Sequence, residues 1–341
     1  LYGRGTLDTK SLGITHLEAF LALHDSGAPM SRDVIFVASA DEEAGGLFGA
    51  GWLVEHHPEI FAGAGFLVNE GGIGIESAGD IVFRIEVAQK RPYWIRLTAR
   101  DKPGHGSSPR TTSAPGRLIA ALQRIQEAPF EARITAPVRA MFATIAPREG
   151  ADWQAPLSNI DNAIGDPEFL RKLQAEKHRL HALVRNTCSI TMLTGSKKIN
   201  VVPPTASAEL DCRILPDEDE AAFRDALVAL INDAQIDIEE ILNFEPAQSD
   251  PDTDLFRLLQ RTSEAYYPNA GVVASVAGGF TDSHFFRERG IISYGYAPFV
   301  VPGAALGGVH GNNEHISIET FERGVRMMTE IVAEFTVSVD P

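Results

Sequence analysis

The sequence contains very little cysteine. Its 341 residues include two cysteines, Cys188 and Cys212, which is too few for the disulfide framework of a small secreted domain. Both lie in runs that look like β-strands. We therefore expect two buried free thiols and no disulfide.

Positive charge and long apolar runs are also scarce. The net charge is −16, which argues against nucleic acid or an anionic membrane surface as the main partner. No apolar run approaches the roughly 20 residues needed to span a bilayer, and we find no repeat or low-complexity linker. A chain with 44% hydrophobic and 22% charged residues has the composition of an ordinary soluble globular protein, long enough for two domains.

The first part of the chain alternates helix and strand patterns. Apolar residues recur at helical spacing over residues 12–24 and 47–57. Residues 33–40 and 64–70 are nearly continuous apolar runs, as expected of strands covered on both faces. This order predicts an α/β domain with an open mixed sheet and helices on both faces.

The pattern changes after Lys90. Residues 93–101 alternate as in a half-exposed antiparallel strand. Further helix patterns cover residues 115–126, 168–183 and 221–234, and further strand patterns cover 187–193 and 207–215. The α/β pattern then resumes at 254–267, 290–295 and 318–335. We therefore predict a discontinuous catalytic domain, residues 1–90 and 245–341, with an inserted α+β lid and dimerisation domain, residues 91–244.

Five short motifs carry acidic or histidine residues in a fixed order. They are GRGTLDTK, ASADEEAGG, VNEGG, GHGSSP and HGNNEHI, which start at residues 3, 38, 68, 104 and 310. Glu42 and Glu43 directly follow one predicted strand and Glu70 follows the next, so all three should lie at the same edge of the sheet.

Adjacent glutamates in a crevice repel each other unless a cation or a proton compensates. A solvated acidic loop is the alternative for an isolated pair. With Asp8 and His310, however, these residues offer carboxylate oxygens and one imidazole, ligands that suit zinc, cobalt or manganese. The motifs together predict metal-assisted hydrolysis.

In the order and spacing of these motifs, the chain resembles the dizinc aminoacylase, acetylornithine deacetylase and carboxypeptidase family of metallohydrolases over nearly its whole length. The resemblance implies that Asp8 bridges two metal ions, that Glu43 and His310 bind one of them, and that Glu70 binds the other. It implies that Glu42 is the general base, which takes a proton from water and passes it to the leaving nitrogen.

The resemblance also implies that the lid and one loop bind the substrate. His105, in the exposed loop GHGSSP, would reach the active site of a neighbouring subunit and stabilise the oxyanion; the alternative is a turn histidine. Asn200 and Arg213 would bind the substrate, and the Arg213 guanidinium could form a bidentate contact with a substrate carboxylate. Pairing with Asp211 is the alternative for Arg213.

A glycine-rich segment, GGFTDSHFF (residues 278–286), resembles the substrate loop of the same family. Gly279 and Thr281 are the contacts that the resemblance implies.

One motif of the family has no counterpart. The family has a His-x-Asp motif well before its bridging aspartate, and only seven residues precede Asp8 here. One metal position would keep Asp8, Glu43 and His310, whereas the other would keep only Asp8 and Glu70. The chain is either a fragment of a longer enzyme or a departure that has lost a metal, and we expect one tightly bound metal at most.

The sequence thus predicts a metal-dependent hydrolase that cleaves an N-acyl amino acid or a small peptide and forms a homodimer through its lid. Exopeptidase and N-acyl-amino-acid deacylase activities both stay open. A non-catalytic dimeric binding protein on the same scaffold is the alternative from another class. We favour the cytoplasm, although a segment upstream of Leu1 could have carried a signal peptide.

Overall fold

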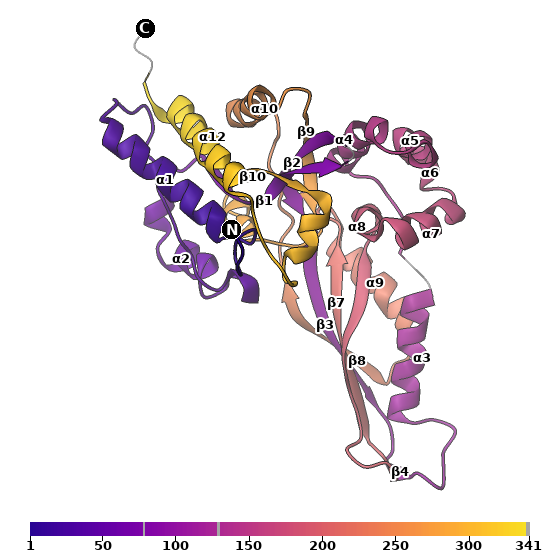
Figure 1. Ribbon diagram of the computed structural model, residues 1–341. Helices are drawn as coiled ribbons and strands as arrows, with labels where there is room; N and C mark the ends of the chain where they lie inside the picture. Colours follow the sequence, from indigo (N-terminus) through magenta and orange to yellow (C-terminus); the bar gives the residue numbers. More distant parts are fainter. Residues whose placement is uncertain (78, 128–129, 339–341) are drawn as a thin grey trace.

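The structure is a computed structural model that describes residues 1–77, 79–127 and 130–338, and it has two main sheets, each with its own core (Figure 1). The first sheet has the strand order β1-β10-β2-β9. These strands are β1 Phe66–Ser77, β2 Asp80–Gln89, β9 Gly271–Ala277 and β10 Ile292–Pro302. Parallel pairs (β1 with β10, β2 with β9) and antiparallel pairs (β2 with β1 and β10) coexist. The predicted open mixed sheet is confirmed.

Helices from both ends of the chain pack on the first sheet and on each other. Helix α1, Lys10–Ser26, lies along α12, Ile318–Thr336, and α10, Asp254–Tyr266, lies beside α12 (Figure 1). The short helices α2, Ala50–His56, and α11, Ser283–Arg287, contact each other, and α11 also contacts β1 and β10. The first and last parts of the chain thereby form one unit.

The second sheet has the strand order β5-β7-β3-β8, and all its pairs are antiparallel. Its strands are β3 Arg91–Arg100, β5 Thr187–Thr194, β7 Thr205–Ile214 and β8 Ile236–Asn243. Alternate residues of β3 and β7 are buried, as the sequence pattern predicts. Helices α3, Ala114–Glu127, and α9, Glu220–Ile231, supply the rest of this core. A small ladder of β4, Gly104–His105, and β6, Val201–Val202, lies at the far end (Figure 1).

A helical segment between α3 and β5 packs back on the first sheet. It consists of α4 Ala136–Ile145, α5 Ala151–Ser158, α6 Ile160–Ala163, α7 Pro167–Glu176 and α8 His178–His181. Buried side chains of this segment, such as Phe142 and Leu173, belong to the first core. The predicted lid, residues 91–244, therefore includes a helical segment that packs in the first core. The second core is built from the residues on either side of this helical segment.

The two cysteines are not free thiols, so that prediction is wrong. Cys188 on β5 lies opposite Cys212 on β7, and the two form a disulfide with their Cα atoms 3.9 Å apart. The residues are 24 positions apart in the sequence, and only the antiparallel pairing of their strands brings them face to face.

The strand predicted at residues 33–40 is also wrong. This segment has no regular secondary structure and pairs with no strand in the described part of the chain. Ile35 and Val37 are 50% and 38% exposed. A strand needs a hydrogen-bonded neighbour, and an apolar run alone does not supply one.

An elongated cavity of about 710 Å³ separates this segment from the free edge of β1. Val34, Phe36 and Val37 line one side and Phe66 and Val68 the other. We call this cavity the open slot.

The described helices were also compared with what a membrane span requires. None is both long enough and apolar enough to cross a bilayer.

Candidate active site

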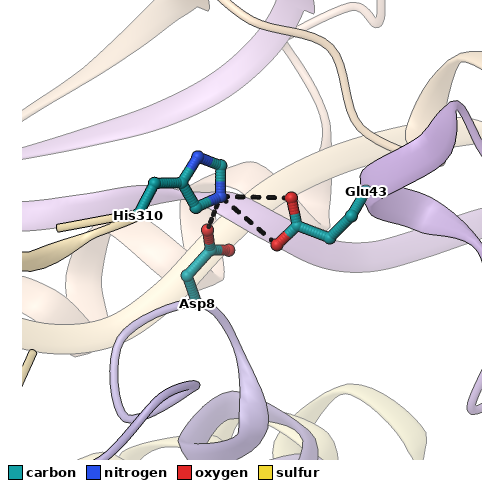
Figure 2. A group of neighbouring side chains, drawn as sticks. All are labelled: Asp8, Glu43 and His310. Carbon is teal, nitrogen blue, oxygen red and sulfur yellow. Dashed lines mark hydrogen bonds and ion pairs between the residues drawn. The ribbon is translucent and has the colours of Figure 1, made fainter.

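Asp8, Glu43 and His310 meet although they lie far apart in the sequence (Figure 2). His310 Nε2 lies 2.9 Å from Asp8 Oδ2 and 3.1 Å from Glu43 Oε2. One potential ligand atom of each residue lies within 4.8 Å of those of the other two. The group therefore has the residue types and the spacing of three ligands around one cation.

A buried carboxylate that the sequence analysis did not single out holds this group together. Glu314 accepts hydrogen bonds from the backbone N–H groups of Gly5, Leu7 and Asp8 at 2.7–3.1 Å, and Arg4 Nη1 lies 2.6 Å from its Oε2. Burial alone would raise the pKa of Glu314, but these hydrogen bonds outweigh it and hold the pKa below its usual range. Glu314 thereby ties the N-terminal motif to the C-terminal motif.

Left-handed backbone conformations shape two of the three loops. Asp41, which precedes the short 3-10 helix η1 (Glu42–Ala44), has φ 71°, and His310 has φ 55°. Residues other than glycine rarely adopt such angles, and those that do are often found at functional sites.

Glu42 and Glu70 form a second acidic pair beside the three-residue group. Burial, the largest influence on both, raises the pKa of Glu42 and of Glu70 above the usual range. Each carboxyl group lies close enough to the other to influence its pKa, and Asp8 and Asp282 add further negative charge. Such a pair retains a proton near neutral pH unless a cation compensates the charge.

The donor set fits a divalent cation. Burial raises the pKa of Asp8 as well, and the nearby Glu43 adds to this effect. Asp8, Glu43 and Glu70 supply carboxylate oxygens and His310 supplies an imidazole nitrogen, ligands that zinc, cobalt and manganese accept. A cation would relieve the repulsion among these carboxylates, so the residues present suit such an ion.

Asp282 is a second acidic residue that the sequence analysis did not single out. It is 6% exposed, and its Oδ2 accepts a hydrogen bond of 2.8 Å from Ser39 Oγ. Burial raises the pKa of Asp282 to about 6. Its position directly after Thr281, within a motif already identified, was the available signal.

The glycine-rich loop is anchored to strand β2 through Thr281 and leaves space beside Gly279. Thr281 N donates to Gln89 Oε1 at 3.0 Å, and Gln89 Nε2 donates back to Thr281 O at 3.3 Å. In the part of the chain that the structure describes, no atom outside its immediate neighbours lies within 4 Å of where a Cβ on Gly279 would be. Gly279 is therefore free to lie against a ligand.

Arg213 lies beside this loop. Its guanidinium is 4.9 Å from the ring centre of Phe280 and pairs with Asp211, with Nε 2.6 Å from Oδ1. The alternative pairing with Asp211 is thus present, and Nη1 is buried without a hydrogen-bond partner among the described residues. Arg213 keeps one unsatisfied donor next to the loop.

His105 and Asn200 lie together, but away from the acidic group. His105 pairs with Val201 across β4 and β6, and Gly106 N donates to Asn200 O at 2.9 Å. Figure 1 shows β4 at the tip of the second sheet, at the opposite end of the chain's fold from the N-terminus and α1. A single copy of the chain therefore does not bring His105 to Asp8.

Comparison with known proteins identifies the family. The model of "Peptidase family M20/M25/M40" matches residues 1–334. The chain belongs to this family. The predicted resemblance to metallohydrolases and the predicted hydrolase class are thereby confirmed, and membership implies a divalent metal.

Two relatives in this peptidase family illustrate its range. N-fatty-acyl-amino acid synthase/hydrolase PM20D1 of Mus musculus is 25% identical over 350 residues, covering 100% of this chain and 69% of the relative. Aminoacylase-1A of Rattus norvegicus is 28% identical over 337 residues, covering 98% and 71%. The chain thus spans roughly two thirds of the length of the relatives it matches.

A solved structure supports the fold. The M20 family metallo-carboxypeptidase Sso-CP2 from Sulfolobus solfataricus has a TM-score of 0.68 and 18% identity, over 97% of this chain and 76% of that one. The α/β fold, with its second, antiparallel sheet, is therefore that of the M20 peptidases.

Proposed function

We propose that this chain carries the catalytic centre of a metal-dependent hydrolase that cleaves the amide bond of an N-acyl amino acid or a small peptide with a free carboxylate. The convergence of Asp8, Glu43 and His310 from three separate motifs is the observation that carries this proposal. The names of the relatives, which include an N-acyl amino acid hydrolase and an aminoacylase, support the substrate class.

Asp8, Glu43 and His310 would hold one divalent cation, with zinc favoured over cobalt or manganese. Glu70 would face a second position that it shares with Asp8. When bound, the cation polarises the scissile carbonyl and makes a water molecule more acidic. Three protein ligands suit a catalytic zinc, whereas two rarely hold one tightly, so we expect one tightly bound ion per chain.

The proton transfers fall to Glu42. Its carboxyl group is not among the three clustered ligands, and burial raises its pKa toward neutrality. A base with a pKa near the working pH can accept a proton from water and then donate it to the leaving nitrogen. Glu42 is therefore the candidate general base and acid.

Substrate contacts would come from the loop and from a second copy of the chain. Gly279 and Thr281 lie at the open loop, and Arg213 offers a guanidinium beside it for a substrate carboxylate. His105 and Asn200 would come from the lid tip of the partner in a two-fold dimer. A dimer of this kind allows each lid to serve the other active site.

Exposed apolar side chains on the lid support the dimer. Met192 and Leu193 on the edge strand β5 are 56% and 67% exposed, and Ile119 on α3 is 63% exposed. An edge strand offers unpaired backbone groups to a second copy.

Glu42→Gln tests the proposed role directly. Turnover of N-acyl amino acids and dipeptides, measured with saturating zinc, should fall by at least about 10²-fold, while zinc binding stays nearly unchanged. Glu55→Gln, an exposed change on α2, is the matched control. Equal turnover in the Glu42→Gln variant and the control would exclude Glu42 as the base.

Metal analysis after dialysis tests the predicted stoichiometry. We expect at most one equivalent of zinc per chain. Two retained equivalents would show that a further residue completes the second position. Substrate binding without any turnover would favour the non-catalytic binding protein.

A further inference from the structure

The strand that carries Glu70 departs from regular pairing at that residue. Asn69 of β1 is opposite Gly295 of β10, and the next paired residues are Ile73 and Ala297. Four steps along β1 thus match two along β10, so Glu70 and the two residues after it form a bulge. Bulges redirect side chains and are often found next to active sites.

The bulge lies directly on strand β2. A Cβ on Gly71 would be 2.4 Å from Glu86 Oε2, and a Cβ on Gly72 would be 2.0 Å from Arg84 O. Gly71 also has φ 131°, where side chains are rarely tolerated. Glu86 Oε2 therefore lies against the backbone of the bulge, and only glycine allows so close an approach. Within the described residues this oxygen has no hydrogen-bond partner.

Glu86 is held in place by a buried arginine. Arg287 Nη1 lies 2.9 Å from Glu86 Oε1, and both side chains are 1% exposed. Arg287 Nη2 also donates to Ser293 O at 2.8 Å. These contacts fix the position of the carboxylate.

Arg287 is the last residue of α11, the helix that follows the glycine-rich loop. At its other end, Ser283 Oγ accepts a hydrogen bond of 3.1 Å from Asn69 Nδ2, next to the bulge. The same helix thus contacts Asn69, next to the bulge, through Ser283, and Glu86, which lies against the bulge, through Arg287. The bulge and the loop cannot shift independently while these contacts persist.

We propose that Glu86 and Arg287 are positioning residues, which set the direction of Glu70 and couple it to the loop with Gly279 and Thr281. This inference rests on the proposed function, because Glu70 matters only if it faces a cation. Glu86 and Arg287 themselves touch neither substrate nor metal. They act through the backbone of the bulge and through α11.

The test compares Glu86→Gln with a variant that only loosens the core. Glu86→Gln keeps the shape of the side chain and one acceptor for Arg287, but it removes the ion pair. Ile85→Val, at the neighbouring fully buried position on β2, is the matched control. Arg287→Lys serves if Glu86→Gln does not fold.

Hydrogen–deuterium exchange of the metal-free chain is the first readout. In Glu86→Gln, exchange should accelerate in peptides that contain Glu70–Gly72 and in peptides that contain Gly278–Ser283, with other peptides unchanged. Ile85→Val should change neither set selectively. Faster exchange in the bulge without the loop, or a uniform increase in both variants, would overturn the proposal.

Cobalt(II) titration is the second readout. Glu86→Gln should weaken binding of the second, weaker cobalt equivalent, which Glu70 would face, about 10- to 100-fold, as loss of a group behind a metal ligand does. The tighter equivalent should be unchanged, and Ile85→Val should leave both unchanged. If Glu70→Gln binds the second cobalt equivalent as tightly as the unmodified chain, the assignment of Glu70 as a ligand fails. The exchange data would then still decide whether Glu86 and Arg287 couple the bulge to the loop.

Discussion

At the scale of single residues, Lys90 is an unusual side chain. It is 0% exposed at the junction of β2 and β3, and its Nζ donates to Arg185 O at 2.8 Å and to Thr187 Oγ1 at 3.0 Å. Both acceptors are uncharged. Burial, with a smaller contribution from Arg213, lowers the pKa of Lys90 to about 7.

This buried amine should make stability depend on pH. An unfolded lysine titrates near 10.5 and the folded one near 7, so the unfolded state binds more protons between these values. The contribution of Lys90 to the free energy of unfolding is therefore full above pH 10.5 and is lost as pH falls toward 7. Relative to Lys90→Met, the unmodified chain should gain up to about 1.4 kcal/mol per pH unit across this window.

Urea unfolding at several pH values measures this effect. Lys102→Met, at an exposed position, is the control and should follow the unmodified chain. A constant difference between the unmodified chain and Lys90→Met across the window would contradict the prediction.

The motifs anticipated some of these residue positions and not others. Asp8, Glu43 and His310 could be expected to meet because the family resemblance implies that all three bind the same metal ion. Glu314 and Asp282 were missed because their partners are backbone N–H groups and a serine hydroxyl, which no spacing rule reveals. The roles of all these residues stay predictions until variants are measured.

At the scale of elements, sequence patterns predicted helices well and strands only where partners exist. The period of apolar residues anticipated α1, α3 and α12 to within a few residues, because a helix makes its own hydrogen bonds. The prediction of a strand at residues 33–40 was wrong because a strand depends on a neighbouring strand. The prediction of free thiols was wrong for the same reason, since the disulfide depends on the register of β5 against β7.

The open slot should bind apolar probes. Its lining includes Val34, Phe36, Val68 and Phe66, so an anilinonaphthalene sulfonate dye should fluoresce on binding there. Val37→Asp should reduce this fluorescence, because it places a charge in the lining. Val228→Asp, at an exposed site on α9, should not. Equal fluorescence in the two variants would place the dye elsewhere.

At the scale of the whole molecule, the arrangement of the lid separates two sets of predicted active-site residues. Asp8 and Glu43 lie on the first unit, whereas His105 and Asn200 lie at the tip of the second (Figure 1). The proposed dimer would reunite them. Sequence periodicity does not reveal which elements pack together. Helices α4–α8, for example, lie within the predicted lid but pack in the first core.

Mixing two inactive variants tests the shared site. Glu42→Gln and His105→Ala should each lose activity as homodimers while still binding zinc. A mixed dimer has one site with both defects and one with neither, so random re-pairing should restore about a quarter of the activity of the unmodified chain. No recovery after confirmed subunit exchange, or full activity of a strictly monomeric chain, would contradict this prediction.

The unpaired segment beside the open slot has a consequence for colloidal behaviour. Val34–Ala38 is a run of five apolar residues that pairs with no strand among the described residues, a composition that favours intermolecular β-pairing. The net charge of −16 keeps copies of the chain apart by electrostatic repulsion, and salt screens that repulsion beyond about 8 Å at physiological ionic strength. The same negative charge that disfavours nucleic acid thus also protects this exposed apolar segment from self-association, and that protection weakens as ionic strength rises.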